Sequence, residues 1–101
     1  MSEIAEFVTL QNHPNYEILT VFPFTIRRKD NHHEMQEHLD KGYYKIRLQD
    51  DNNRGSYKKH RLIAEQFIPN PENFPQVDHI NHNRQDNHLE NLRWCSQSTN
   101  Q

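Results

Sequence analysis

The stretch from Val77 to Trp94, VDHINHNRQDNHLENLRW, holds three histidines and four asparagines in eighteen positions, which is unusually polar for a segment with apolar ends. Asp78 and His79 are adjacent within it. Neighbouring residues of a strand point to opposite faces, so both side chains reach one site only where the strand bends. A hairpin closed by a wide loop provides such a bend. The simpler alternative is a well-hydrogen-bonded turn without chemistry.

This stretch and Asn100 downstream of it contain groups that could cleave a phosphodiester. We expect Asn100 to lie one turn into a helix packed across the hairpin, where it and Asp78 would supply oxygen ligands for one Mg²⁺ or Mn²⁺. Neutral His79 would take a proton from water as the general base. The amide of Asn91 could hydrogen-bond the imidazole and fix its tautomer. Because only Gln101 follows Asn100, we expect this last helix to be short, or truncated.

Charge is distributed unevenly along the chain. The formal net charge is −2, yet residues 41–61 carry seven basic against two acidic side chains. A basic band of this kind is typical of a surface that faces nucleic-acid phosphates, and the alternative is a solvated face. We predict double-stranded DNA as the partner, contacted by a set of basic side chains. This set is Arg27, Arg28, Lys45, Arg47, Lys58, Lys59, His60, Arg61, Arg84 and Arg93.

Composition limits the other possibilities. With 101 residues, 32% of them hydrophobic, the chain fits one domain or two small modules that share a thin core. A single cysteine, Cys95, excludes an internal disulfide and a cysteine-rich zinc site. There is no signal-peptide pattern and no apolar run of about 20 residues, so we expect an intracellular protein, cytoplasmic or nuclear, with no membrane contact.

Periodicity predicts an α+β fold with a small antiparallel sheet. We read residues 1–15 as a polar entry segment, 15–21 and 24–29 as strands, and 30–42 as a loop or weak helical turn. Residues 43–49 alternate apolar and basic and pair with 56–60 across a turn that contains Gly55. A short amphipathic helix follows at 60–68, then strands at 76–80 and 89–95 around a polar loop. Residues 96–101 begin with a serine that could cap the final helix.

The string HRLIAEQFIPNPENFPQVDHINHNRQDNHLENLRWCSQSTN, residues 60–100, resembles the HNH endonucleases of phages and mobile introns, the homing-type branch with a ββα-metal fold. The resemblance implies that His79 is the base, that Asp78 and Asn100 bind one divalent ion, and that Asn91 orients His79. It assigns Asn87 to the shape of the loop.

Residues 12–29 are similar, more loosely, to a modular segment found ahead of such nucleases. Phe-Pro-Phe stands there in place of the family's glycine.

These observations predict two modules. Residues 1–59 would form a β-rich module whose basic hairpin contacts DNA, and residues 60–101 a ββα-metal nuclease module. We expect a metal-dependent DNA endonuclease of the homing type, encoded by a phage or mobile element. The alternative is a DNA-binding module that has lost catalysis and keeps the HNH unit as part of its fold.

Overall fold

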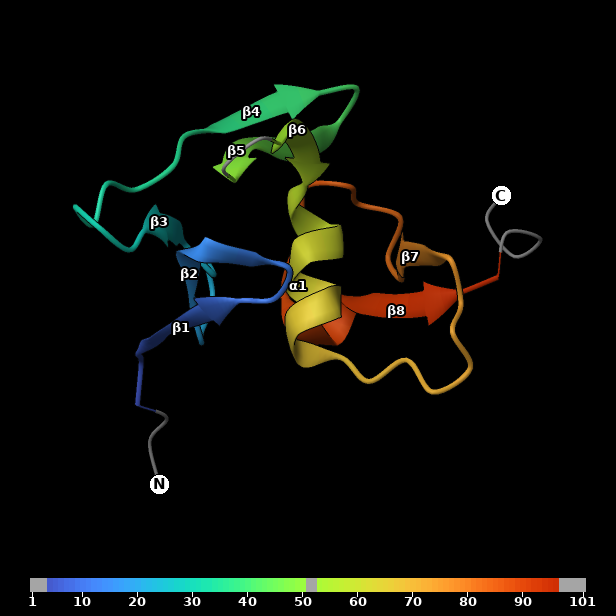
Figure 1. The fold of residues 1–101 in the computed structure, drawn as a ribbon. Coiled ribbons are helices and arrows are strands. Elements are labelled where there is room, and N and C mark those ends of the chain that lie inside the picture. The colour runs from blue at the N-terminus through green and yellow to red at the C-terminus, as the bar shows by residue number, and fades with distance from the viewer. Residues whose placement is uncertain (1–3, 51–52, 97–101) are drawn as a thin grey trace.

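The computed structural model describes residues 4–50 and 53–96, in three small antiparallel sheets around one helix (Figure 1). The elements are, in chain order, β1 (Phe7–Leu10), β2 (His13–Leu19), β3 (Ile26–Arg28), β4 (Glu37–Asp40), β5 (Tyr43–Asp50), β6 (Asn53–Lys58), α1 (Lys59–Phe67), β7 (Gln76–His79), the 3₁₀ turn η1 (Leu89–Asn91) and β8 (Leu92–Cys95). Each strand pairs with a strand next to it in the chain, giving the orders β1-β2-β3, β4-β5-β6 and β7-β8.

The helix α1 lies at the centre of the molecule and provides the surface on which the sheets pack (Figure 1). Its residues Leu62, Ile63 and Ala64 are buried and belong to one core cluster that also contains Ile18, from β2, and Leu92, from β8. The helix ends before Pro69, because proline disfavours the helical conformation of the residue that precedes it. Both halves of the chain therefore contribute to one core.

The hairpin β5–β6 separates an apolar face from a polar one. Ile46 and Leu48 are buried, whereas Arg47 and Gln49 are exposed, as strand alternation requires. The turn between β4 and β5 is formed by Lys41 (φ 55°) and Gly42 (φ 86°), and two consecutive positive φ angles are typical of a two-residue hairpin turn.

The predicted α+β class agrees with the sheet-rich fold and its one described α-helix, but several boundaries were wrong. The entry segment 1–15 contains β1 and the start of β2, and the expected loop at 30–42 contains β4. All four residues of β4 are exposed, so no apolar pattern marks it and its pairing with β5 defines it. The strand expected at 89–95 begins with the turn η1. The final helix, with Asn100, falls outside the described residues.

Membrane spanning has no support in the described ranges 4–50 and 53–96. The α-helix in these ranges has nine residues, whereas a helix that spans a membrane needs about 20.

Lys59, predicted to contact DNA, is buried instead, with 1% of its surface exposed. Its ammonium donates to the Glu37 carboxylate and to the carbonyl oxygen of Pro23, 3.1 Å away. Burial lowers the pKa of Lys59, and the hydrogen bond and charge of Glu37 act in the opposite direction. Lys59 thus ties the start of α1 to β4 and to the segment between β2 and β3, so it is not available to phosphates.

We predict that Lys59→Ala lowers the free energy of unfolding by about 2 kcal/mol, because it removes a buried stem and leaves the Glu37 carboxylate without its cation. Urea denaturation measures the change. The matched control is Lys58→Ala at the exposed neighbouring position, for which we expect a loss of about 0.5 kcal/mol or less. Equal losses in the two variants would contradict the structural role of Lys59.

Candidate active site

His79 lies at the end of β7 and is buried, with 4% of its surface exposed. Its Nε2 is 2.8 Å from Oδ1 of Asn87, a buried residue of the loop 81–88 between β7 and η1. A carboxamide oxygen only accepts hydrogen bonds, so Nε2 carries the proton in this contact. The lone pair then resides on Nδ1. Of the two neutral tautomers, the contact thus selects the one whose Nδ1 bears the lone pair.

Two further rings pack against this imidazole. The His60 ring is centred 4.6 Å from that of His79, and the Tyr43 ring is 5.1 Å from His60 and 6.0 Å from His79. His60 opens the first turn of α1 and Tyr43 begins β5, so three elements meet here. Burial, and after it the charges of His79, Lys58 and Arg61, lowers the pKa of His60 to about 3, against a backbone hydrogen bond with Val77 that raises it. His60 is therefore neutral beside His79 at physiological pH.

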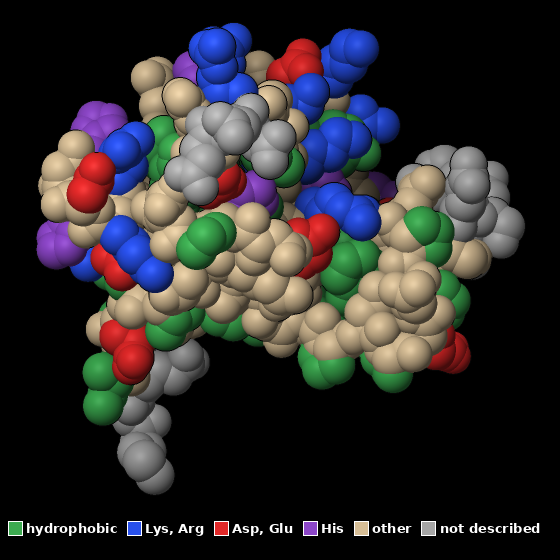
Figure 2. Space-filling view, in the orientation of Figure 1, with side chains coloured by type: hydrophobic (Ala, Val, Ile, Leu, Met, Phe, Trp, Pro, Cys, Tyr) green, Lys and Arg blue, Asp and Glu red, His purple; other side chains and the backbone are tan. Residues whose placement is uncertain are grey.

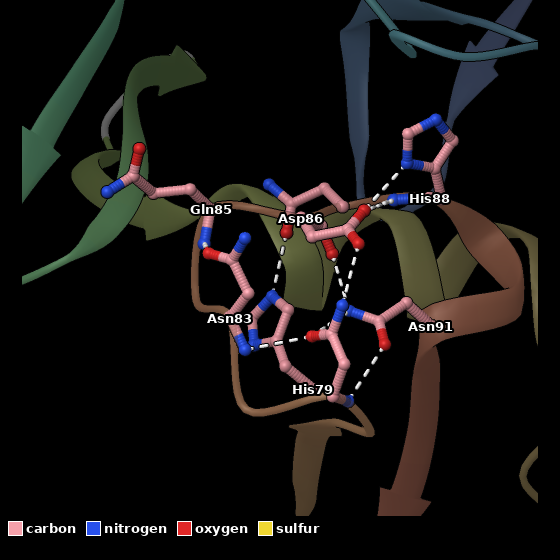
Figure 3. Close-up of polar contacts among 8 residues, drawn as sticks. His79, Asn83, Gln85, Asp86, His88 and Asn91 are labelled. Atoms are coloured by element: carbon pink, nitrogen blue, oxygen red, sulfur yellow. Dashed lines mark hydrogen bonds and ion pairs between the residues drawn. The ribbon is translucent and has the colours of Figure 1, made fainter.

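Asn91 fixes the loop rather than the ring (Figure 3). Its Nδ2 donates to Asn81 Oδ1 at 3.0 Å and to the carbonyl of Asp86 at 2.9 Å, and its Oδ1 accepts from the Asn81 backbone N–H at 3.0 Å. These hydrogen bonds connect Asn91, after the loop, to Asn81 at its start and to Asp86 within it. The contact that we predicted between Asn91 and the His79 imidazole is instead made by Asn87, because the loop folds back over the ring.

Strand alternation places the Asp78 and His79 side chains on opposite faces of β7, so the bend that we expected to bring both to one site is not present in this strand, whose register with β8 is regular. The cross-strand partner of Asp78 is Arg93, whose Nη2 donates to Asp78 Oδ2 at 3.1 Å. Both hydrogen bonds that the Arg93 guanidinium donates to Asp78 go to Oδ2, so Oδ1 is the oxygen that Arg93 does not occupy. Within residues 4–50 and 53–96 there is no cluster of three or more His, Cys, Asp or Glu side chains suited to a metal. The described residues thus supply one of the two predicted ligands, and the other, Asn100, lies outside them.

Lys and Arg side chains gather over the hairpin β5–β6 (Figure 2). Lys58 and Arg84 both lie over the Tyr43 ring, at 4.6 and 4.9 Å from its centroid. Lys45 pairs with Asp40 at 2.7 Å, whereas Arg47 is exposed and forms no ion pair with any described residue. A cationic surface therefore begins beside the ring stack and continues along the hairpin.

Three other arginines that we predicted to contact DNA form ion pairs with nearby carboxylates. Arg27 pairs with Glu17 at 2.7 Å, and Arg28 with Asp30 at 2.9 Å. Arg61 donates to the carbonyl of Pro75 and pairs with its helix neighbour Glu65.

Sequence reasoning missed two members of the site. Asn87 was assigned to loop shape although it bonds the candidate base, and Tyr43 was read only as part of a strand pattern. No local signal marks either residue, since both reach His79 through the tertiary fold.

A family model and two single proteins are similar to this chain in sequence. Residues 57–101 match the family model described as HNH endonuclease. Two uncharacterized HNH endonucleases of Acanthamoeba polyphaga mimivirus are similar: L245, 32% identical over 90% of this chain, and L247, 42% identical over 58% of it. The chain spans 27% of the length of L245 and 16% of that of L247.

A solved structure also resembles the fold. It concerns DNA binding and cleavage by the HNH homing endonuclease I-HmuI, and it superposes with a TM-score of 0.77 over 93% of this chain and 54% of that one. The sequence identity is 24%, so this likeness establishes the fold alone.

The buried His60 leads to a prediction on pH. Its pKa is about 3 in the folded chain against 6.5 for the free side chain, so between these values the unfolded state binds more protons and stability falls as pH falls. We expect His60 to cost about 2 kcal/mol of stability at pH 5 relative to pH 8. In the variant His60→Phe this contribution disappears, and urea denaturation across pH 5–8 should show a flatter profile. Parallel profiles for the two proteins would contradict the burial of a neutral His60.

Proposed function

Residues 57–101 belong to the HNH endonuclease family, and from that membership we propose that the chain is a metal-dependent DNA endonuclease of the homing type. The observation that supports the proposal most directly is the His79 imidazole, held by Asn87 with Nδ1 basic. The curated relatives are much longer than this chain, so the proposal concerns the chemistry of the site that it contains.

His79 is the proposed general base. Its Nδ1 takes a proton from the water that attacks the phosphorus, while the Nε2–H bond to Asn87 selects the tautomer in which Nδ1 bears the lone pair. His60 stays neutral beside it and adds no positive charge that would oppose protonation of His79. Asn91 acts as a positioning residue through the loop, since it touches Asn81 and Asp86 rather than the ring.

Asp78 and Asn100 are the proposed ligands of one Mg²⁺ or Mn²⁺. Carboxylate and carboxamide oxygens suit either ion, and Asp78 Oδ1 is the oxygen that Arg93 leaves available. Such an ion, when bound, would stabilise the negative charge that develops on the phosphate oxygens and the leaving group. Arg93 orients the carboxylate through its two hydrogen bonds to Oδ2.

The outer face of β5–β6 is the proposed contact with the DNA backbone, within the module of residues 1–59. Strand alternation places Lys45 and Arg47 on the same face as Tyr43, and the register sets Lys58 opposite Lys45. The face therefore ends at the ring stack that holds His79, so phosphates bound along the hairpin would lead the scissile bond to the nuclease module, 60–101. Affinity of this kind depends strongly on salt and weakly on sequence.

A second candidate is a DNA-binding module without catalysis. The ion pair between Asp78 and Arg93 favours it, because a carboxylate satisfied by arginine is a poorer metal ligand. The two candidates share the DNA surface and differ in the metal, so a chelator distinguishes them.

We predict that His79→Ala abolishes the Mg²⁺-dependent nicking of supercoiled plasmid while gel-shift affinity for DNA changes little, because the base lies below the cationic face rather than on it. EDTA should stop the parent enzyme and leave DNA binding intact. Nicking by the variant at the parental rate would show that the base is wrongly assigned. A parent that shifts DNA without nicking it in Mg²⁺ or Mn²⁺ would support the second candidate.

A separate prediction tests the DNA surface. Arg47→Ala should weaken binding to unrelated duplexes equally and reduce the slope of log K against log[salt] by about 0.9, the loss of one phosphate contact. The control is Arg27→Gln, which removes the same charge from a side chain committed to Glu17 and should leave the slope unchanged. Fluorescence anisotropy at several salt concentrations measures both. Identical slopes for Arg47→Ala and the parent would exclude this face as the backbone contact.

A further inference from the structure

The segment Phe22–Pro23–Phe24 reaches from the core to the loop that carries Asn87. Phe24 is buried and packs against Phe67 of α1, with ring centroids 5.6 Å apart. Its φ of 57° is rare for a bulky residue, and such backbone conformations persist where the surroundings hold them. Phe22 meets Phe24 edge-on at 6.2 Å. The base of this segment is thus anchored to the helix from which His60 also arises.

The outer ring of the segment lies directly on the site loop. The Phe22 and His88 rings are parallel within 6°, with centroids 3.8 Å apart. His88 is also held by its own loop, because its Nδ1 at the ring edge lies 2.6 Å from Asp86 Oδ1 (Figure 3). Asp86 also accepts from Asn81 Nδ2 at 2.9 Å. Phe22 therefore stacks on a ring that is already held in the hydrogen-bond network of the loop.

The stacked ring is the direct neighbour of the residue that holds the base. Asn87 lies between Asp86 and His88 in the chain, and its Oδ1 makes the 2.8 Å contact with His79 Nε2. We propose that Phe22 is a positioning residue for the reaction, which acts by clamping His88 so that Asn87 stays aligned on His79. This inference rests on the proposed role of His79 as general base.

The composition of the loop explains why a clamp of this kind matters. Residues 81–88, NHNRQDNH, contain no hydrophobic side chain, so the loop cannot be held by burial of its own apolar groups. Its hydrogen bonds compete with water, which makes each of them worth little by itself. Two ring contacts join it to the first half of the chain, Phe22 on His88 and Arg84 over Tyr43. The first is the one next to Asn87.

The test compares Phe22→Ala with Phe22→Trp, which restores a stacking surface, and with Leu39→Ala as the matched control. Phe22 is 50% exposed and Leu39 is 55% exposed, so both truncations remove a half-exposed hydrophobic side chain, but Leu39 lies on β4 and does not belong to the clamp. Two quantities are measured on the full chain. One is the exchange rate of the His79 Nε2–H, observed by NMR of ¹⁵N-histidine-labelled protein, and the other is plasmid nicking in Mg²⁺ as kcat and KM.

We expect Phe22→Ala to speed exchange of the Nε2–H and to lower kcat about 10-fold with KM unchanged, since small misplacements of a catalytic group cost rates of this order. Phe22→Trp should recover both values, and Leu39→Ala should match the parent. In the double variant Phe22→Ala/His88→Ala the loss should be no greater than in His88→Ala alone, because the side chain on which Phe22 acts is already absent there. Unchanged exchange in Phe22→Ala would overturn the clamp. Because exchange is measured without DNA, it decides this inference even if the parent proves not to cut.

Discussion

The hydrogen bond between His79 Nε2 and Asn87 Oδ1 is the interaction on which the site depends. An imidazole can carry its proton on either nitrogen, and only the tautomer with a bare Nδ1 offers a base on that side of the ring. The rest of the site maintains this bond. His60 and Tyr43 pack against the ring, and Asn91 closes the loop that presents Asn87. A polar contact of 2.8 Å thus selects the tautomer that the proposed chemistry requires.

The two halves of the chain share one core, and polar contacts beside the site join them further. Lys59 hydrogen-bonds Glu37 of β4 and the carbonyl oxygen of Pro23, and it directly precedes His60 in the chain. The same few residues therefore set both the packing of the sheets on α1 and the position of the ring stack. Changes in the N-terminal half would be transmitted to His79 by this route, since among the described residues the rings that pack against His79 are those of Tyr43 and His60.

Sequence patterns predicted β5, the helix and β7 well, because these segments alternate or repeat their apolar residues clearly. The turn expected around Gly55 was wrong, because Gly55 lies within β6 opposite Leu48, and β6 spans Asn53–Lys58 rather than 56–60. β4 escaped prediction because its four side chains are all exposed and only backbone pairing defines it. The string around His79 located the site, and the resemblance to HNH homing endonucleases that it carried is confirmed. The choice between Asn87 and Asn91 as partner of the ring could not be made, since it depends on how an eight-residue polar loop folds back.

The pairing of each described strand with its neighbour in the chain has a consequence for how the protein reaches its native state. Closing a short connection costs little entropy, and proteins dominated by such local pairings have low contact order and fold quickly. Each sheet is built from strands that are adjacent in the chain. The stack of Phe22 on His88 joins parts of the chain that are far apart in sequence, so we expect it to form late. Catalytic competence would then be acquired after most secondary structure is already in place.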